Sequence, residues 1–301
     1  MTGFSEIPAP PEHTPGDDPP FIRVRPPGPQ SRSWLTRHAH SAAPMGLKGA
    51  DSRDSKTRHP GVVLCKGQGS NVLDVDGNRY VDLAGGFGAQ LLGHRHPSIL
   101  RALEFQATRL TQALGEVLPS DAKVSLVERL AGLYPERGAQ AILAQSGSDA
   151  VTAALKTAAL HTGLPGVIAF SGAYHGLGYA PLAACGLRPS YLEPFRTQLN
   201  PRVRFVEYPR DQASMLDALC AVQDALSGDG IGAILVEPIL GRGGCIVPPE
   251  GFVSELGRLA KASGAVMIAD EIWTGLGRSG KLLFSGSETQ GPDLICLGKG
   301  L

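Results

Sequence analysis

A lysine between two glycines follows an apolar segment near the end of the sequence. Lys299 comes after residues 294–297 and is flanked by Gly298 and Gly300, so little side-chain bulk surrounds its amine. Desolvation beside an apolar strand lowers the pKa of a lysine and makes its neutral amine available for covalent chemistry with a carbonyl. A surface lysine in a turn is the alternative when this residue is considered alone.

Acidic residues follow two other apolar segments. Asp270 and Glu271 come after residues 265–269, and Glu237 comes after residues 233–236. A carboxylate at the end of a buried strand is costly unless it is paired, and a protonated ring nitrogen is one cation that it can face. A helix cap or an ordinary salt bridge explains each acid equally well when it is taken alone.

Small residues open a predicted helix after residues 141–144. The sequence there is Ser146, Gly147 and Ser148. Free backbone N–H groups and the helix dipole favour an anion such as phosphate at a helix start. An ordinary N-cap at Ser148 or Asp149 is the alternative.

An aromatic residue stands between glycines after residues 167–170. Tyr174 is followed by His175, and an aromatic ring in such a loop can lie flat against a planar ligand. A loop aromatic that packs on the core is the alternative.

Two further patterns are set aside. Residues 275–280 fit G-x-G-x-x-G and, with Lys281, nearly fit a phosphate-binding loop. Both motifs require a helix to follow, and Leu282 stands where the magnesium-binding hydroxyl belongs. His94 and His96 lack a third ligand at metal-site spacing. The sequence therefore predicts no nucleotide site in this loop and no metal site.

Short apolar strands alternate with helices from about residue 120 onward and position the candidate residues. Strands are predicted at residues 141–144, 167–170, 203–208, 233–236, 265–269 and 294–297. Helices are predicted at residues 121–133, 148–161, 211–226 and 250–263. Non-alternating apolar strands are typical of strands buried on both faces, so we predict an α/β fold with a mostly parallel central sheet and helices on both faces. Ligands bind such sheets at the carboxyl ends of the strands, where the candidate residues stand.

The N-terminal part of the chain differs from the rest in its composition and hydrophobic pattern. Residues 1–30 hold nine of the 24 prolines and are predicted to be a disordered or loosely docked arm. Residues 31–96 are predicted to hold weak helical structure at best and then a small β-meander around the turn at residues 76–78. A helix at about residues 97–111 begins a larger domain, residues 97–301.

Composition narrows the function classes. With 28 basic and 28 acidic residues, the chain has no general positive field for nucleic acid or an anionic membrane. No apolar run reaches the roughly 18 residues that a membrane span requires. Five cysteines without a CxxC pair, and no secretory signal, favour a reducing cytoplasm. We therefore expect small-molecule chemistry in the cytoplasm, without nucleic acid or membrane as a partner.

Taken together and in this order, these segments resemble class III aminotransferases of the ω-amino-acid type, which are pyridoxal-phosphate enzymes of fold type I. The resemblance covers about residues 60–301. It is carried by residues 74–82, 92–97, 146–150, 174–176, 236–239, 270–280 and 297–300. It implies that residues 31–96 belong to an incomplete small domain and that residues 97–301 form the large cofactor-binding domain.

The resemblance also implies a role for each candidate residue. Lys299 is the catalytic lysine that anchors the cofactor covalently and then moves a proton, and Asp270 keeps the pyridine nitrogen protonated. The other residues implied to bind pyridoxal 5'-phosphate are Ser146, Gly147, Ser148, Tyr174, His175 and Glu237. Among them, Gly147 and Ser148 hold the phosphate and Tyr174 stacks on the ring.

Two positions depart from the family pattern. Trp273 stands where relatives usually have a glutamine that reaches the phenolic oxygen of the cofactor, and an indole cannot accept that hydrogen bond. Arg242 stands where many relatives have a glutamate that pairs with a substrate-binding arginine. We expect Arg242 at the substrate mouth, where its guanidinium favours a carboxylate-bearing substrate; a solvated loop arginine is the alternative.

The expected activity is transfer of an amino group from an amine or amino acid to a 2-oxo acid by a homodimer. An aminomutase, decarboxylase or racemase on the same scaffold shares every residue named above, and the sequence does not reveal the donor or the acceptor. Relatives continue well beyond the position of Leu301, so we also expect a fragment truncated after the catalytic lysine and inactive alone.

Overall fold

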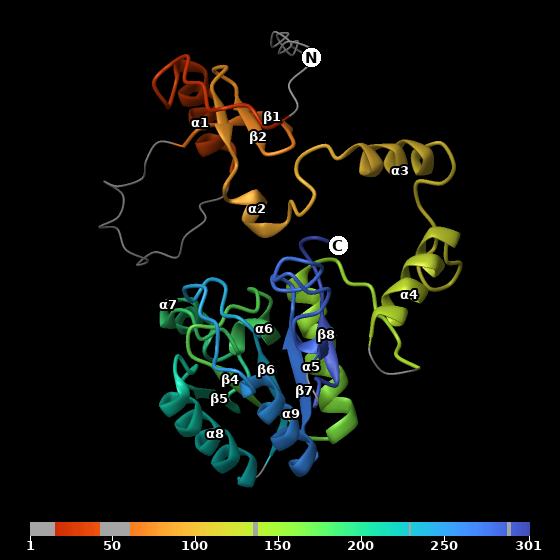
Figure 1. Ribbon diagram of the computed structural model, residues 1–301, viewed down its shortest axis with the longest axis vertical. Coiled ribbons are helices and arrows are strands. Elements are labelled where there is room, and N and C mark those ends of the chain that lie inside the picture. Colours follow the sequence, from red (N-terminus) through yellow and green to blue (C-terminus); the bar gives the residue numbers. More distant parts are fainter. Residues whose placement is uncertain (1–15, 43–60, 135–137, 229, 288–289) are drawn as a thin grey trace. The chain divides into compact units, whose positions relative to one another are not determined.

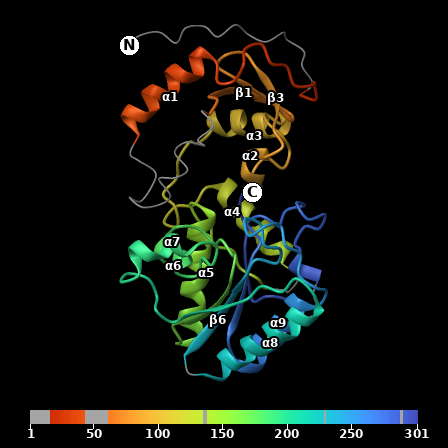
Figure 2. The ribbon, with the colours of Figure 1, turned by 90° about the vertical axis from the view of Figure 1, so that its left-hand side faces the viewer.

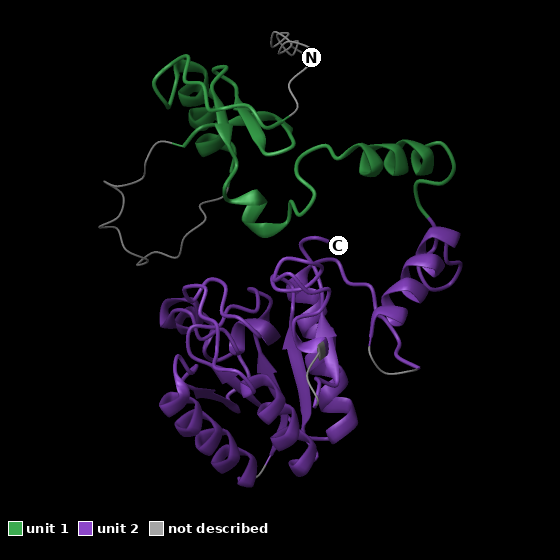
Figure 3. Cartoon of the chain, viewed as in Figure 1, with its two compact units in different colours: residues 1–112 green, residues 113–301 purple. Residues whose placement is uncertain are grey.

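The computed structural model describes residues 16–42, 61–134, 138–228, 230–287 and 290–301 (Figure 1, and Figure 2 from a second side). The chain forms two compact units, which divide between Gln112 and Ala113 and are coloured separately in Figure 3. The sequence instead places a boundary at residue 97, so helix α3 (Pro97–Ala107) falls in the first unit rather than in the second. All of the predicted cofactor and substrate residues lie in the second unit.

The first unit contains a three-stranded antiparallel sheet in the order β1 (Leu64–Gln68), β2 (Asn71–Asp74) and β3 (Arg79–Val81). The short helix α2 (Gly85–Gly88) and then α3 follow it. Between β2 and β3 the chain turns at Gly77, whose positive φ of 83° suits a residue without a side chain. The predicted meander is therefore present. Beyond it, His94 pairs with Asp82 (2.8 Å), and no metal-binding group of three His, Cys, Asp or Glu side chains occurs among the described residues.

Residues 16–28 run along this sheet, so the disordered alternative for the arm up to residue 30 is wrong for them, and the docked alternative describes them. The N–H of Phe21 donates to the carbonyl of Arg79 (2.9 Å), and the N–H of Arg79 donates back (2.8 Å). The Asn78 side-chain oxygen accepts two further backbone N–H groups of this segment (2.8 and 2.9 Å). The meander thus supplies partners that a proline-rich segment lacks within itself. Residues 1–15 lie outside the described residues.

Helix α1 (Pro29–Ser41) begins where the same meander supplies a capping carboxylate. Asp76 accepts the N–H groups of Gln30 (2.8 Å) and Ser31 (2.9 Å). Burial by itself raises the pKa of Asp76, but hydrogen bonds from Ser31 and Gln30 hold this pKa below its ordinary value. The stretch after residue 30 is therefore a full helix, capped by a residue far away in sequence.

The second unit is built on a five-stranded parallel sheet. In spatial order its strands are β5 (Val203–Val206), β4 (Gly166–Phe170), β6 (Ile231–Val236), β7 (Val266–Asp270) and β8 (Leu294–Cys296). All four neighbouring pairs are parallel, which confirms the predicted fold class. Because the strands are parallel, their carboxyl ends meet at one edge of the sheet.

Helix α5 (Gly147–Thr162) covers one face of this sheet, and α8 (Gln212–Ser227) and α9 (Phe252–Ser263) cover the other. The second unit also contains α4 (Asp121–Leu133), α6 (Tyr179–Ala183) and α7 (Pro189–Leu192), with 3-10 turns at Glu193–Phe195 and Ser285–Ser287. In β4, Ile168 and Phe170 join the core beneath α8 and α9, whereas Val167 and Ala169 join the core beneath α5 (Figure 2). Within the part of the chain that is described, no helix has both the length and the apolarity to cross a membrane.

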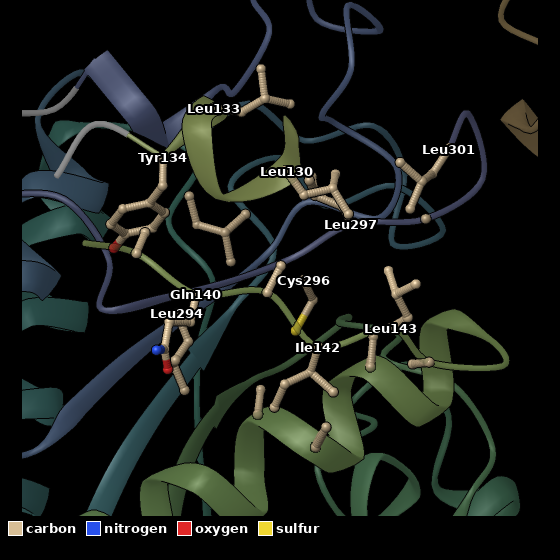
Figure 4. A pocket seen from close by; sticks show the side chains of 18 of the residues that line it. Leu130, Leu133, Tyr134, Gln140, Ile142, Leu143, Leu294, Cys296, Leu297 and Leu301 are labelled. Atoms are coloured by element: carbon tan, nitrogen blue, oxygen red, sulfur yellow. The ribbon is translucent and has the colours of Figure 1, made fainter. Parts of the chain in front are cut away.

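Residues 141–144 do not form the predicted strand. A cavity of about 800 Å³ lies between this extended segment and β8 (Figure 4). Ile142 is 72% exposed and Leu143 is 37% exposed, so their apolar side chains face open space instead of a sheet. The apolar pattern is that of a strand, but a strand also needs a hydrogen-bonded neighbour, and the cavity separates this segment from β8.

Candidate active site

The start of helix α5 is suited to an anion. Ser146, and neither of the two alternatives, is the N-cap, because its hydroxyl accepts the N–H of Asp149 (3.2 Å). Ser148 lies in the first turn, where its hydroxyl oxygen accepts the N–H of Gly178 (3.0 Å). The N–H groups of Gly147 and Ser148 have no partner within the helix because they belong to its first turn. These donors and the helix dipole together make a favourable place for phosphate.

Glycines allow the neighbouring loops to approach this helix start. A Cβ on Gly176, whose φ is 108°, would lie 2.6 Å from the Ser148 Cβ. A Cβ on Gly147 would lie 2.7 Å from Cδ1 of Ile272, and one on Gly298 would lie 3.2 Å from Cγ2 of the same isoleucine. Ile272 thus separates the helix start from the lysine loop. Sequence reasoning missed this residue, whose only signal is an apolar side chain inside an acidic motif.

Asp270 and His175 form a buried pair at the carboxyl ends of β7 and β4. Nδ1 of His175 lies 2.7 Å from Oδ2 of Asp270, and the N–H of Ile272 donates to Oδ1 (3.2 Å). The side chains are 0% and 4% exposed, respectively. Nε2 of His175 is a buried nitrogen with no hydrogen-bond partner among the described residues. A carboxylate has lone pairs for further donors, so this arrangement leaves room for an N–H from a ring.

Glu237 joins two loops at the end of β6. The N–H of Tyr174 donates to its Oε1 (2.6 Å), and the N–H of Gly241 donates to its Oε2 (2.9 Å). Burial raises the pKa of Glu237, and the nearby Asp270 carboxylate also raises it, while His175 and the two N–H donors act in the opposite direction. Besides the role beside the cofactor that the sequence predicts for it, Glu237 therefore holds the backbones of two loops together.

Lys299 follows β8 in a strained backbone conformation. Its φ of 52° lies in the left-handed region, which side chains other than glycine rarely adopt. The residue is exposed by surface area, yet protein atoms surround its amine closely enough for burial to lower its pKa. Asp270 and Glu237 raise this pKa, and Arg242 lowers it further. These interactions place the lysine within electrostatic reach of both acids and of the arginine.

Tyr174, Arg242 and Trp273 lie beside this group. The guanidinium carbon of Arg242 is 4.2 Å from the centroid of the Tyr174 ring. The Trp273 indole lies against Gly241, where an added Cβ would be only 3.0 Å from its Cε3 atom. The structure therefore brings all of the sequence-predicted residues to the carboxyl edge of one sheet.

Glu271, which directly follows Asp270, has a different role from Asp270. Glu271 is 1% exposed and accepts the N–H groups of Phe284 (2.7 Å) and Ser285 (2.8 Å). It thereby fixes the chain that follows residues 275–280, which form turns. No α-helix follows these turns within the described residues, in agreement with the sequence analysis.

Comparison with known proteins finds similar chains. The family profile described as "Aminotransferase class-III" matches residues 52–301. The acetylornithine aminotransferase of Methanopyrus kandleri is 34% identical over 240 residues, which make up 80% of this chain and 59% of that protein.

The solved structures that resemble this chain are also aminotransferases. An (S)-enantioselective omega-transaminase from Thermomicrobium roseum has a TM-score of 0.78 at 26% identity, over 89% of this chain and 63% of its own. The taurine:2-oxoglutarate aminotransferase of Bifidobacterium kashiwanohense, in complex with PLP and glutamate, has a TM-score of 0.79 at 25% identity, over 89% of this chain and 62% of its own. This chain thus spans less than two thirds of the length of these relatives.

Proposed function

Because the chain belongs to the class-III aminotransferases, which use pyridoxal 5'-phosphate, we propose that the protein transfers an amino group from an amine or amino acid to a 2-oxo acid. The observation that carries this proposal is the convergence of Lys299 with Asp270 at one sheet edge, beside the open start of α5. When bound, the cofactor supplies an electron sink for the bonds at the substrate carbon.

The residues present fit this cofactor at both of its ends. Gly147 and Ser148 would hold the phosphate with N–H groups at the start of α5, where a side chain on Gly147 would meet Ile272. Asp270 would accept the N–H of the pyridine ring, and His175 would hold the carboxylate in place from the other side. Tyr174 would lie against the ring, because Glu237 fixes its backbone.

Lys299 would bind the cofactor covalently through Nζ and then carry the proton at that atom. A lowered pKa gives a larger fraction of neutral amine at a given pH, which suits both tasks. We further propose that the enzyme is a homodimer of the cytoplasm. The homodimer follows from the family resemblance, and the cytoplasm from five cysteines without a CxxC pair.

Amino transfer can be tested in the natural full-length polypeptide that contains these residues. The cofactor-loaded protein is mixed with single donors in the absence of an acceptor, and the absorbance of the bound cofactor is followed. Conversion by a donor, reversed by a 2-oxo acid, supports amino transfer. Release of carbon dioxide, or rearrangement of the donor without exchange, would point to the decarboxylase or aminomutase alternative.

Gly176→Ala is expected to weaken cofactor binding by at least about tenfold, which corresponds to roughly 1.4 kcal/mol. A Cβ at this position would lie 2.6 Å from the Ser148 Cβ and 3.0 Å from its Cα, and the φ of 108° is unfavourable for alanine. Titration of the apoprotein with pyridoxal phosphate measures the effect. Gly132→Ala in α4 is the matched control, because no atom lies within 4 Å of its Cβ position. Equal affinity in the two variants would contradict the placement of Ser148 at the phosphate.

Residues 1–301 by themselves are expected to be poorly soluble and to show no turnover. The outer side of β8 faces the cavity, whose lining includes the exposed Ile142 and Leu143. An unpaired strand edge beside apolar side chains promotes aggregation. Size-exclusion chromatography and an amino-transfer assay would compare this polypeptide with the natural full-length one. Comparable activity in both would rule out a functional need for covering this cavity.

A further inference from the structure

Arg242 is held in a defined place by a short, closed loop. Leu240 and Ile246 exchange two backbone hydrogen bonds of 3.0 Å, which close the loop at its base. At the top of the loop, the guanidinium carbon of Arg242 lies 4.2 Å from the Tyr174 ring centroid. Although Arg242 is exposed, a cation over an aromatic face is an attractive arrangement. The arginine therefore has a preferred position and does not simply extend into water.

The loop of Arg242 and the loop of Tyr174 are fastened to each other. Glu237 accepts one backbone N–H from each loop, at 2.6 Å from Tyr174 and 2.9 Å from Gly241. A Cβ on Gly243 would lie 2.7 Å from the carbonyl oxygen of Gly172, so the two backbones touch. The ring and the guanidinium are thus positioned by backbone contacts on both sides.

The guanidinium keeps its hydrogen-bonding capacity. Within the part of the chain that the structure describes, no carboxylate forms an ion pair with Arg242 and no acceptor binds its N–H groups. Contact with a ring face uses none of these donors, and a planar guanidinium offers two parallel N–H groups that match a carboxylate. Arg242 is also close enough to Lys299 for its positive charge to lower the pKa of the Lys299 amine.

We propose that Arg242, held on the face of Tyr174, binds a carboxylate of the substrate, so that the preferred donors and acceptors are amino acids and oxo acids and not simple amines. This inference rests on the proposed amino transfer. Trp273 packs on Gly241, next to Arg242, and places an apolar side chain beside the guanidinium. A substrate with a short apolar chain and a carboxylate suits this combination.

The test compares substrates that differ only in the carboxylate. Alanine is paired with 2-aminopropane, and 4-aminobutyrate is paired with butylamine. In the natural full-length enzyme loaded with cofactor, Arg242→Gln is expected to raise KM at least tenfold for the carboxylate-bearing member of a pair, with kcat and the values for the amine changed less than threefold. Arg242→Lys, which keeps the charge but loses the planar fork, is expected to fall between these results.

Arg258→Gln is the matched control, because Arg258 pairs with Glu255 on the surface of α9 (2.7 Å). Equal losses for both members of each pair, or unchanged values for the carboxylates, would overturn the assignment. Binding of glutarate, an unreactive dicarboxylate, gives a readout that does not need turnover. Weaker glutarate binding in Arg242→Gln supports the docking role of Arg242. If no donor reacts but glutarate binding is weaker in this variant, the proposed amino transfer is wrong and the docking role still holds. Equal glutarate binding in both proteins overturns the docking role.

Discussion

Lys299→Ala is expected to abolish covalent attachment of the cofactor and to reduce amino transfer by at least about 10³-fold, within the range for loss of a positioned proton-transfer group. The amine of Lys299 is the proposed nucleophile, and its pKa responds to Asp270 and Glu237 at the sheet edge. Borohydride reduction of the wild-type protein, followed by peptide mapping, should place the pyridoxyl label on this lysine.

Lys261→Ala provides the control for this experiment, because Lys261 lies in the last turn of α9 and is exposed. It is expected to keep both the label and the activity. A label on Lys261 or Lys281 in the wild-type protein would refute the assignment of Lys299. Activity of Lys299→Ala within tenfold of wild type would do so as well.

The pH dependence of cofactor capture gives a further measurement on Lys299. Burial lowers the pKa of this amine from its ordinary value of 10.5, Asp270 and Glu237 raise it, Arg242 lowers it, and the net direction is downward. Since only the neutral amine attacks, the rate of capture should rise with pH and level off below pH 10.5. A midpoint at or above that value would contradict the environment described for this lysine.

The positions of most site residues could be predicted because they end or follow strands of one parallel sheet, whereas Ser146, Gly147 and Ser148 follow an extended segment outside the sheet. Asp270 and His175 are far apart in sequence, yet Asp270 ends β7, His175 follows β4, and their side chains meet at 2.7 Å. The rule that carboxyl ends of parallel strands share one edge is enough to bring such residues together. It does not reveal that His175 contacts Asp270 directly, because that contact depends on the path of one loop and the rotation of two side chains.

Contacts to the backbone were harder to foresee. Glu237 receives N–H groups from Tyr174 and Gly241, and Asp76 receives those of Gln30 and Ser31. Neither pairing leaves a pattern in the side-chain sequence, since every residue except proline offers the same N–H. The disordered alternative for the arm was wrong for residues 16–28 for this reason. The prediction of a strand at residues 141–144 was wrong for a related reason. A hydrophobic pattern indicates a strand, but it does not show whether a neighbouring strand is present to pair with it.

Asp270→Asn is expected to reduce the rate of amino transfer by at least about 10²-fold, or roughly 2.7 kcal/mol of barrier, while the cofactor still binds. The amide is nearly the same size as the carboxylate, so packing against His175 and the hydrogen bond from Ile272 can persist. What is lost is the negative charge that, in the proposed function, would hold a proton on the ring nitrogen of the cofactor. The charge of Asp270 also raises the pKa of Lys299, so its removal lowers that pKa further and favours the neutral amine. Failure of the covalent anchor therefore does not explain a loss of turnover in this variant.

Asp293→Asn separates the effect of charge from the effect of a damaged sheet. Asp293 also supports β7, because its carboxylate accepts the N–H of Met267 (2.8 Å) and its own N–H donates to the Met267 carbonyl (2.9 Å). Asp293 directly precedes β8 and contacts Met267 near the beginning of β7, whereas Asp270 ends β7. The same substitution therefore removes a carboxylate either from the start of the strands or from the carboxyl edge, where the cofactor would bind. We expect Asp293→Asn to lower thermal stability modestly and to leave kcat within threefold of wild type. A loss below tenfold in Asp270→Asn, or equal losses of kcat in the two variants, would mean that Asp270 supports the sheet and does not set the protonation of the cofactor.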